Sequence, residues 1–297
     1  MASRSEGARV LITGGGGFTG RYVQSALAAA GYRPVDAEGT GVRFDLRDRA
    51  SIEAVLRATA PQYLIHLAAV SFVGHQDATE FYAVNSVGTT NLLDAVASSG
   101  LGLQRLIVAS SANVYGNATV EPIREDTAAA PANHYAASKL AMEAMVRTYS
   151  NRLPILITRP FNYTGVGQTA HFLVPKLVEH FAQRRAVVEL GNLDVVRDFS
   201  DVRAVAEAYV RLLAAEVPGG VTNLCSGIGQ SLRWVVEQLS ELSGHRIEVR
   251  VNQALVRASE VHRLVGSATI MRAALGELPF CDFRETLKWM LDARTAT

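Results

Sequence analysis

Short apolar runs alternate with amphipathic segments along most of the chain. The runs contain few charged residues, and they lie at 9–13, 63–69, 105–111 and 153–162. Such runs are typical of strands that are buried on both faces of a parallel sheet. Between them, apolar residues recur at helical spacing, as Ile52, Val55 and Leu56 do before Pro61. This repeated alternation predicts an α/β fold with a doubly wound parallel sheet.

Weaker patterns extend the prediction to the C-terminus. Further strands are expected at 34–38, 42–46, 186–190 and 220–225, the last of them back in the main sheet. Further helices are expected at 85–99, 172–184, 267–275 and 283–290, with another ending near Glu216. Between two of these elements, residues 163–171 lose the apolar pattern, which favours a loop at the active site.

Composition narrows the class of protein. The chain has 297 residues, a formal net charge of +1, 48% hydrophobic residues and 19% charged residues, as in an ordinary globular protein of one or two domains. The charge favours neither nucleic acid nor an anionic membrane as a partner. Without a signal peptide or an apolar run of 18 residues, a cytoplasmic location is expected. Cys225 and Cys281 match neither a disulfide framework nor a zinc pattern, so two reduced thiols and no metal are expected.

A glycine motif follows the first predicted strand. Gly14-x-x-Gly17-x-x-Gly20 lies between the strand at 9–13 and an amphipathic helix that stops at Gly31. Strand, glycine turn and helix are the context of a dinucleotide-binding loop, in which the backbone and the helix N-terminus meet the pyrophosphate. A flexible turn is the alternative. The loop and the strand order predict a Rossmann-type domain.

The preference between NAD and NADP stays open at this point. Asp36 and Glu38 follow the glycine motif at the distance from which a carboxylate binds the adenosine ribose hydroxyls. Either could instead be a solvated loop residue. The nearby cations could meet a 2′-phosphate, and they are Arg21, Arg33 and Arg43.

Two domains follow from the order of elements. We expect a dinucleotide-binding domain at 1–162 and about 200–226. Residues at about 163–199 and 227–297 should form a small, discontinuous C-terminal lobe that closes a cleft over the sheet. Ligands bind at the carboxyl ends of the strands in such sheets.

A Tyr-x-x-x-Lys pair lies inside a predicted helix. Tyr135 and Lys139 are four residues apart, so both side chains can point into one site. A free phenol has a pKa of ~10, and a nearby cation lowers it. Ser111 follows the predicted strand at 105–111, where its hydroxyl could hold a substrate oxygen or merely form a turn. Each signal alone is weak.

Taken together, the chain resembles the extended short-chain dehydrogenase/reductases that modify nucleotide sugars. The matches run from Val10 to the C-terminal helix. They comprise the glycine motif, Asp45-Leu46, His66-Leu67-Ala68-Ala69, Ser111 to Gly116, Tyr135-x-x-x-Lys139, Arg159 to Asn162, Arg197-Asp198-Phe199 and Asn223 to Gly227.

The resemblance implies a catalytic triad. Tyr135 would exchange a proton with a sugar hydroxyl or ketone oxygen, Lys139 would lower the Tyr135 pKa and hold the nicotinamide ribose, and Ser111 would orient the sugar oxygen. The implied cofactor, NAD(H) or NADP(H), would be bound by Gly14, Gly17, Phe18, Thr19, Gly20, Asp36, Glu38, Asp45, Leu46, Leu67, Ala68, Ala69, Asn85, Tyr135, Lys139 and Pro160.

The implied substrate is a nucleotide sugar, with a GDP-sugar favoured by resemblance alone. Its predicted contacts are Ser71, Val73, Ser111, Asn113, Asn162, Val174, Arg197 and Arg257. Among these, Asn162 would touch the sugar-side phosphate and Arg197 the diphosphate, since a guanidinium offers a fork of donors. Arg257 would help from the C-terminal lobe or be a surface arginine, and Phe72 would lie with its neighbours in the sugar pocket.

The residues after Ser111 restrict the reaction. Dehydratases of this family carry an acidic residue there, whereas this chain has Ala112 and Asn113, which cannot supply an acid or base. GDP-fucose-forming epimerase-reductases place a cysteine at the position of Asn113. Without that cysteine, His171 is better interpreted as a loop histidine than as a 3,5-epimerase residue.

Reductase and 4-epimerase remain. Residues 159–168, 194–202 and 223–227 are most similar to the GDP-4-keto-6-deoxy-D-mannose reductases that form GDP-D-rhamnose. The alternative is a nucleotide-sugar 4-epimerase with tightly bound NAD. A third hypothesis, a non-enzymatic dinucleotide-binding regulator, fits the intact triad poorly. Relatives dimerise through two long helices, so a homodimer is expected through 85–96 and 135–149.

Overall fold

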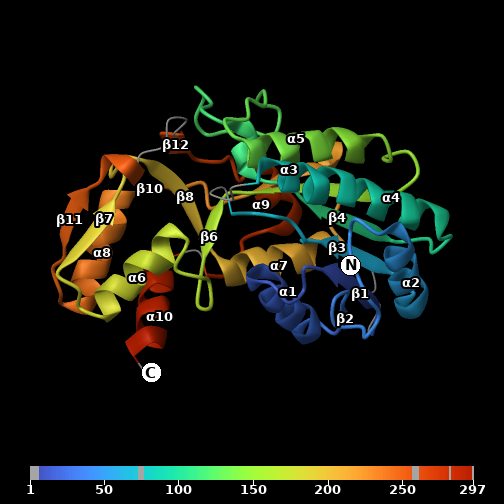
Figure 1. Ribbon diagram of the computed structural model, residues 1–297, viewed down its shortest axis with the longest axis horizontal. Coiled ribbons are helices and arrows are strands. Elements are labelled where there is room, and N and C mark those ends of the chain that lie inside the picture. The colour runs from blue at the N-terminus through green and yellow to red at the C-terminus, as the bar shows by residue number, and fades with distance from the viewer. Residues whose placement is uncertain (1–6, 73–76, 256–260, 281, 296–297) are drawn as a thin grey trace.

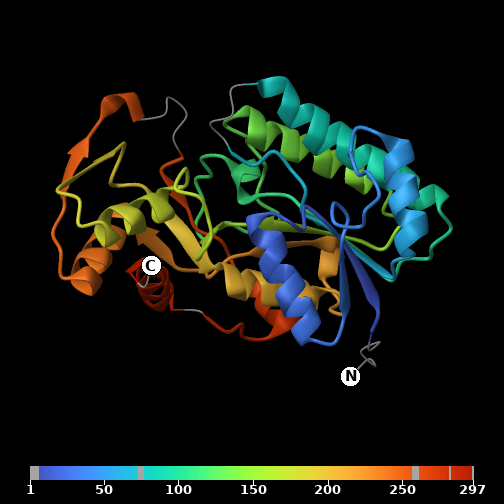
Figure 2. The ribbon, with the colours of Figure 1, turned by 60° about the horizontal axis from the view of Figure 1, so that its bottom comes forward.

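The protein consists of a large α/β part and a smaller part beside it. A computed structural model describes residues 7–72, 77–255, 261–280 and 282–295. In Figure 1 the large part surrounds one sheet, and the smaller part carries α6, α8 and α10. Figure 2 shows the N-terminus on the large part and the C-terminus on the smaller one.

Six parallel strands form the main sheet, in the order β2-β1-β3-β4-β5-β9. Thr13 lies opposite His66 in the register of β1 and β3. Because all strands run the same way, their carboxyl ends meet at one edge. This confirms the predicted doubly wound sheet. The strands are β1 (Arg9–Thr13), β2 (Arg33–Asp36), β3 (Tyr63–His66), β4 (Arg105–Ala109), β5 (Ile155–Pro160) and β9 (Val221–Leu224).

Helices cover both faces of the main sheet (Figure 1). On one face, Val10 and Ile12 share an apolar core with α1 (Phe18–Ala29), α7 (Val202–Leu212) and α9 (Thr269–Leu275). On the other, Leu11 shares a second core with helices that run side by side in Figures 1 and 2. This alternation along β1 is the period of two of a strand. The second group comprises α2 (Arg49–Thr59), the π-helix η1 (Phe81–Gly88), α4 (Thr89–Ser98) and α5 (His134–Arg147), and the short helix α3 (Ala78–Glu80) leads into η1.

The strand predicted at 42–46 is wrong, because this segment is a loop. Leu46 is buried against the second core, and Phe44 is partly buried there, which explains the alternating apolar pattern. Backbone groups of this loop form hydrogen bonds with side chains and not with a neighbouring strand. The Asn91 amide donates to the Leu46 carbonyl at 2.9 Å, and the Asp45 N–H donates to the Ser51 hydroxyl at 3.0 Å.

The smaller part contains two further sheets. β8 pairs with β10, β12 and β6, while β7 and β11 form a parallel pair. Three helices pack around them. The elements are β6 (Asn162–Thr164), α6 (Leu173–Ala182), β7 (Val187–Leu190), β8 (Val196–Asp201), β10 (Gly229–Ser231), α8 (Leu232–Ser243), β11 (Glu248–Val251), β12 (Arg263–Leu264) and α10 (Phe283–Thr295). Short 3₁₀ turns are η2 (Ala112–Tyr115), η3 (Pro218–Gly220) and η4 (Gln253–Leu255).

Two features of the smaller part differ from the sequence prediction. The run expected as one strand at 153–162 divides at Phe161, after which β6 joins the second sheet. β8 was not predicted, because Arg197-Asp198-Phe199-Ser200-Asp201 is too polar to resemble a buried strand. Its partners are distant in sequence, so only the folded chain makes it a strand.

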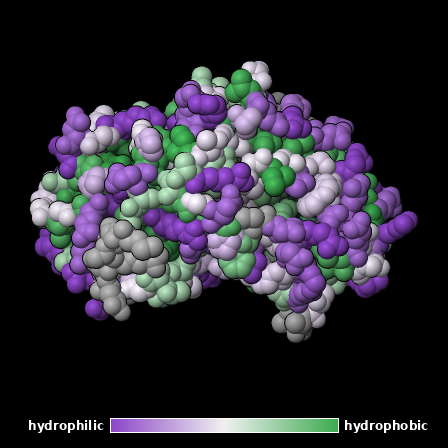
Figure 3. All heavy atoms as spheres, turned by 180° about the vertical axis from the view of Figure 1, so that it is seen from behind, coloured by the Kyte–Doolittle hydropathy of each residue, from purple (hydrophilic) through white to green (hydrophobic). Residues whose placement is uncertain are grey.

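The surface is mixed in character. On the face opposite to that of Figure 1, hydrophilic and hydrophobic residues are interspersed (Figure 3). Within the described residues, no helix combines the length and the apolar character that a membrane span requires.

Candidate active site

The glycine loop between β1 and α1 is too closely packed for side chains at its motif positions. Gly14 has a φ of +73°, and a Cβ atom there would lie 2.8 Å from the Ala68 nitrogen. A Cβ atom at Gly20 would overlap the carbonyl oxygens of Gly14 and Gly15. The helix α1 begins directly after Gly17, which has no side chain to cap it. The exposed helix N-terminus suits the pyrophosphate of a dinucleotide.

Phe18 and Thr19, in the first turn of α1, are linked to the strand β6. The Thr19 and Tyr163 hydroxyls are 2.8 Å apart, and the Phe18 ring stacks on Tyr163 with centroids 6.3 Å apart. Tyr163 also acts electrostatically on Tyr135. The glycine loop is thereby connected to the region of the predicted triad, a link that sequence spacing does not indicate.

Two carboxylates lie at the end of β2 beside this loop. The Gly14 N–H donates to the Glu38 carboxylate at 2.9 Å and 3.2 Å, and a Cβ atom at Gly15 would lie 2.5 Å from Asp36 Oδ1. Partial desolvation, and then a hydrogen bond shared with Asp36, raise the pKa of Glu38. This is where a bound dinucleotide places its adenosine ribose. Arg33 begins β2, at the opposite edge, and cannot serve a 2′-phosphate here.

Leu67, Ala68 and Ala69 continue from β3 along the glycine loop. The Leu67 N–H donates to the Thr13 carbonyl at 3.1 Å, and the Ala68 N–H donates to the Thr13 hydroxyl at 3.3 Å. Pro160 ends β5 at the same edge of the sheet. These predicted cofactor residues therefore lie at one edge of the main sheet, at the carboxyl ends of the strands.

Asp45 and Leu46 lie in the loop that replaces the predicted strand. Asp45 forms an ion pair with Arg47 at 2.9 Å. The hydrogen bond from the Arg47 side chain holds the pKa of Asp45 at about 2. Leu46 is buried, and its Cβ atom would lie 2.8 Å from a Cβ atom added at Gly88.

Ser111 follows β4 at the carboxyl edge and precedes η2. Its hydroxyl accepts the Asn113 N–H at 3.2 Å and the Asn113 side-chain amide at 3.1 Å. The same hydroxyl is hydrogen-bonded to Tyr135. Ser111 therefore forms the turn, as the simpler interpretation held, and also contacts the predicted acid.

Tyr135 and Lys139 lie in the first half of α5, and both are buried, with 8% and 4% of their surfaces exposed. The helix is fixed at its start because the Ala136 N–H donates to the Asn133 side chain at 2.9 Å. The Lys139 ammonium donates to the Ala109 carbonyl at 2.8 Å, at the end of β4. The spacing of four residues thus directs both side chains toward the strand that carries Ser111.

Burial dominates the protonation of this pair. It raises the pKa of Tyr135 to about 12, against the hydrogen bond from Ser111. It lowers the pKa of Lys139 to about 8, against the nearby Glu143 carboxylate. The Ser111 hydroxyl lowers the Tyr135 pKa, the Lys139 ammonium donates to the Ala109 carbonyl, and the expected effect of Lys139 on Tyr135 stays a prediction. At neutral pH Tyr135 is a protonated phenol that can donate a proton.

Asn85 lies in the π-helix η1 and is fully buried. Its side chain accepts the Val70 N–H at 2.9 Å and donates to the Val70 carbonyl at 3.1 Å and to the Ser138 hydroxyl at 3.1 Å. It therefore connects the segment after β3 with the residue next to Lys139. This arrangement holds the site together, and the cofactor contact that the resemblance implies for Asn85 stays a prediction.

The predicted substrate residues have different environments. Ser71 and Asn162 are exposed, and Asn113 is half-buried beside Ser111. The Arg197 guanidinium donates to the Val196 and His262 carbonyls at 2.9 Å and 3.3 Å. Val174 packs in the core of the smaller part and is only 3% exposed. Val73, Arg257 and Cys281 lie outside the described residues.

Aromatic side chains connect the two parts of the molecule near these positions. The Phe72 ring lies 5.9 Å from the His171 ring and 6.2 Å from the Phe172 ring, measured between centroids. Phe72 follows β3, whereas Phe172 precedes α6. His171 thus belongs to an exposed aromatic contact between the parts.

The sequence did not reveal the buried polar residues that lie next to the predicted triad. Glu143 and Arg159 form a buried ion pair with N and O atoms 2.7 Å apart, and Ser110 also binds Glu143. The only signal was spacing, because Glu143 repeats the four-residue interval after Tyr135 and Lys139. That interval by itself does not distinguish a buried carboxylate from a solvated one.

The fold and this geometry define a dinucleotide-binding oxidoreductase of the extended short-chain dehydrogenase/reductase type. Comparison with known proteins gives the family directly. The model of the NAD dependent epimerase/dehydratase family matches residues 10–225, so the chain belongs to that family. It is an NAD(P)-dependent enzyme that modifies nucleotide sugars.

Three relatives extend over nearly the whole chain. A GDP-6-deoxy-D-talose 4-dehydrogenase from Aggregatibacter actinomycetemcomitans is 34% identical, covering 96% of this chain and 98% of the relative. A GDP-6-deoxy-D-mannose reductase from Pseudomonas aeruginosa is 33% identical, covering 95% and 96%. The structure of RMD from Pseudomonas aeruginosa, complexed with NADPH, superimposes with a TM-score of 0.87 at 31% identity, covering 98% of each chain.

Proposed function

We propose that this enzyme reduces a nucleotide-bound 4-keto-6-deoxy sugar, converting GDP-4-keto-6-deoxy-D-mannose to GDP-D-rhamnose. The observation that carries the proposal is the protonated Tyr135 phenol, which is hydrogen-bonded to Ser111. The two residues after Ser111, Ala112 and Asn113, supply no acid. A site with one proton donor suits the reduction of a ketone better than the removal of water, which needs a further acid or base.

The chain's own residues have separate roles in this reaction. When bound, the nicotinamide supplies the hydride that C4 of the sugar receives. The Ser111 hydroxyl holds the C4 oxygen beside Tyr135. Tyr135 donates its proton to that oxygen as the negative charge develops, and Lys139 stabilises the resulting phenolate.

A product with the opposite configuration at C4 of the sugar also has specific support. One relative of 34% identity is named for GDP-6-deoxy-D-talose, and another of 33% identity for GDP-6-deoxy-D-mannose. These two sugars differ in configuration at C4. The same triad could act on either, because the face of C4 that receives the hydride depends on how the sugar lies in the pocket.

The acidic end of β2 supports NAD(H) as the preferred cofactor. Asp36 and Glu38 both lie at the glycine loop, with Glu38 bound to the Gly14 N–H at 2.9 Å. A 2′-phosphate beside these carboxylates would be repelled, whereas ribose hydroxyls can donate hydrogen bonds to them. We keep the homodimer as part of the proposal, with α4 and α5 as its interface.

Consumption of reduced cofactor tests the proposal. The purified protein is mixed with NADH or NADPH and GDP-4-keto-6-deoxymannose, and the absorbance of the nicotinamide is followed. We expect stoichiometric loss, and a decrease in kcat of roughly 10²–10⁴-fold in Tyr135→Phe, because the proton donor is removed. NMR of the product then distinguishes GDP-D-rhamnose from GDP-6-deoxy-D-talose.

The same experiment identifies the main alternative. A 4-epimerase would retain NAD through purification and convert its nucleotide sugar without added cofactor. No loss of NADH or NADPH, together with NAD released on denaturation, would contradict the reductase proposal. Full activity of Tyr135→Phe would contradict the assigned proton donor.

A further inference from the structure

A buried carboxylate lies one helical turn beyond Lys139 on α5. Glu143 is 0% exposed, and both of its oxygens have charged or polar partners. Oε1 accepts hydrogen bonds from Ser110 Oγ at 2.6 Å and Arg159 Nε at 2.8 Å. Oε2 accepts from Arg159 Nη2 at 2.7 Å and Arg147 Nη2 at 2.8 Å. Such complete pairing is what makes a buried charge tolerable.

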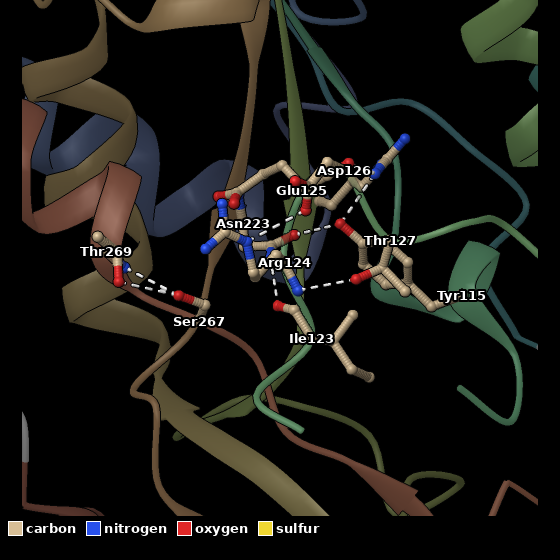
Figure 4. A network of polar contacts seen from close by, with 10 residues as sticks. Tyr115, Ile123, Arg124, Glu125, Asp126, Thr127, Asn223, Ser267 and Thr269 are labelled. Atoms are coloured by element: carbon tan, nitrogen blue, oxygen red, sulfur yellow. Dashed lines mark hydrogen bonds and ion pairs between the residues drawn. The ribbon is translucent and has the colours of Figure 1, made fainter. Parts of the chain in front are cut away.

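Arg159 extends this pairing across the end of the sheet. Its Nη1 atom donates to the Tyr115 hydroxyl at 2.8 Å and to the Glu125 carbonyl at 3.0 Å. The Tyr115 hydroxyl in turn donates to the Asn223 side chain at 2.7 Å. Figure 4 shows Tyr115 and Asn223 grouped with the segment 123–127 in one polar network.

The two ends of the turn that carries Ser111 are therefore held by one ion pair. Ser110, directly before Ser111, is bound to Glu143 itself. Tyr115, the last residue of η2, is bound to Arg159. Between these two anchors, the Ser111 hydroxyl reaches Tyr135 on the same helix as Glu143. The Glu143 side chain thus links α5, which carries Tyr135, to the turn that carries Ser111.

We propose that Glu143 is a positioning residue for catalysis, which clamps the 110–115 turn through Ser110 and Arg159 and acts on Lys139 from one helical turn away on α5. The proposal deepens the proposed function, because it rests on the roles assigned there to Ser111, Tyr135 and Lys139. Glu143 does not touch the reacting atoms, so its effect is exerted through these three side chains.

The charges around Lys139 give the proposal a signature in pH. The ionisable groups that interact electrostatically with Lys139 are Glu143 on α5 and His66 on β3. Burial keeps His66 neutral, with a pKa of about 3, and Glu143 opposes the loss of the Lys139 charge. Arg147 and Arg159, with Tyr115, face Glu143 on its other sides. Removing the carboxylate leaves cations near Lys139, so the ammonium should lose its proton at lower pH.

Three variants and a control separate positioning from simple stability. Ser110→Ala removes the direct link between Glu143 and the turn, and keeps the ion pair and its contact with Tyr115. Glu143→Gln removes the charge, and Glu143→Asp restores it with a shorter reach. Glu207→Gln breaks a partly exposed pair of the same length on α7, where Glu207 and Arg211 are 2.7 Å apart. For each, kcat, KM, the pH profile of kcat and the melting temperature are measured.

The titration of Lys139 gives a readout that needs no substrate. The chain has three lysines, Lys139, Lys176 and Lys288, so NMR with ¹³C-labelled lysine side chains gives few signals, and Lys139→Met identifies the relevant one. In Glu143→Gln, we expect the Lys139 signal to titrate at lower pH than in the unmodified protein. Glu143→Asp should recover part of the shift.

The expected kinetic result is a decrease in kcat with little change in KM. A displacement of about 1 Å at a reacting group can cost on the order of 10²-fold, so we expect kcat to fall roughly 10–100-fold in Ser110→Ala and Glu143→Gln. In Glu143→Gln the alkaline decline of activity should also begin at lower pH. Glu207→Gln should keep both kcat and the profile.

Two outcomes would overturn the inference. One is a folded Glu143→Gln protein whose Lys139 titration and pH profile match the unmodified protein. The other is a Ser110→Ala protein with unchanged kcat, which decides the question even if Glu143→Gln fails to fold. If the unmodified protein consumes no NADH or NADPH, the proposed function fails, while the Lys139 titration still tests the role of Glu143.

Discussion

At the scale of single residues, the site depends on burial acting on Tyr135 and Lys139 in opposite senses. Burial raises the phenol pKa to about 12 and lowers the ammonium pKa to about 8. Near neutral pH both groups therefore keep a proton. This is the state that reduction of a ketone requires, because the phenol must give a proton and the ammonium must stabilise the phenolate.

The acidic pair at the end of β2 leads to a prediction about cofactor choice. The enzyme should use NADH with a higher kcat/KM than NADPH, because Asp36 and Glu38 would repel a 2′-phosphate by ~1–4 kcal/mol per charge. The double variant D36N/E38Q keeps the shapes and removes the charges, so the ratio of the two kcat/KM values should fall by about tenfold or more.

A matched control for this prediction is Glu53→Gln. Glu53 is a surface carboxylate that pairs with Arg49 on α2, and its loss should leave the ratio unchanged. A native enzyme that prefers NADPH would contradict the prediction. The structure of RMD from Pseudomonas aeruginosa was solved as a complex with NADPH, so both cofactors need to be tested.

At the scale of elements, the site is assembled where α1, η2 and α5 meet the carboxyl edge of the sheet. Each element begins or ends at a residue that the site uses. α1 follows Gly17, η2 follows Ser111, and α5 begins one residue before Tyr135. Helix N-termini carry backbone N–H groups that have no partner within the helix. Residues at the carboxyl ends of the strands project beyond the sheet, so ligand-binding groups gather at this edge.

The close packing of α1 on its loop gives the second prediction. Gly20→Ala should weaken NADH binding and destabilise the protein by about 1–3 kcal/mol, because its Cβ atom would overlap two carbonyl oxygens. Gly16→Ala is the control, since the nearest atom to its Cβ, Asp36 Oδ2, is 3.8 Å away. Fluorescence titration with NADH and urea unfolding measure the two effects. Equal behaviour of the two variants would contradict the argument.

At the scale of the whole molecule, the proposed catalytic groups and some of the predicted substrate residues lie on different parts. Ser111, Tyr135 and Lys139 belong to the main sheet and its helices, while Arg197 lies on β8 of the smaller part. The chain crosses between the parts at Phe161, where β5 ends and β6 begins. A nucleotide sugar bound across both parts would therefore be oriented by their mutual packing.

The outer face of the α4–α5 layer supports the third prediction, a homodimer. Val87 on η1 and Met145 on α5 are large apolar residues, 56% and 40% exposed. Burying such residues against a second copy is favourable. Sedimentation of the unmodified protein at micromolar concentration should give a dimer, and V87E/M145E should give a folded monomer. The exposed Val251 on β11 offers a control, because Val251→Glu should leave the dimer intact.

Much of the fold and of the triad was predictable because it depends on local spacing. The strands with continuous apolar runs, the glycine motif with its spacing of three and the pair Tyr135 and Lys139 with its spacing of four can each be recognised within a short stretch of the chain. The segment 42–46 misled the same reasoning, because its apolar residues pack as a loop on the second core. Burial alone produces such a pattern, whether or not the backbone pairs with a strand.

By itself, the sequence determined the parallel α/β architecture, the dinucleotide loop and the helix that presents Tyr135 with Lys139. Tertiary structure alone decided that β8 is a strand, that Glu38 binds the Gly14 N–H, and that Glu143 lies beneath the triad. The physical reason is the distance along the chain between the residues that interact. Periodicity is a property of neighbours in the chain, whereas the partners of a polar backbone or a buried charge come from segments far away in sequence and are brought close only by folding.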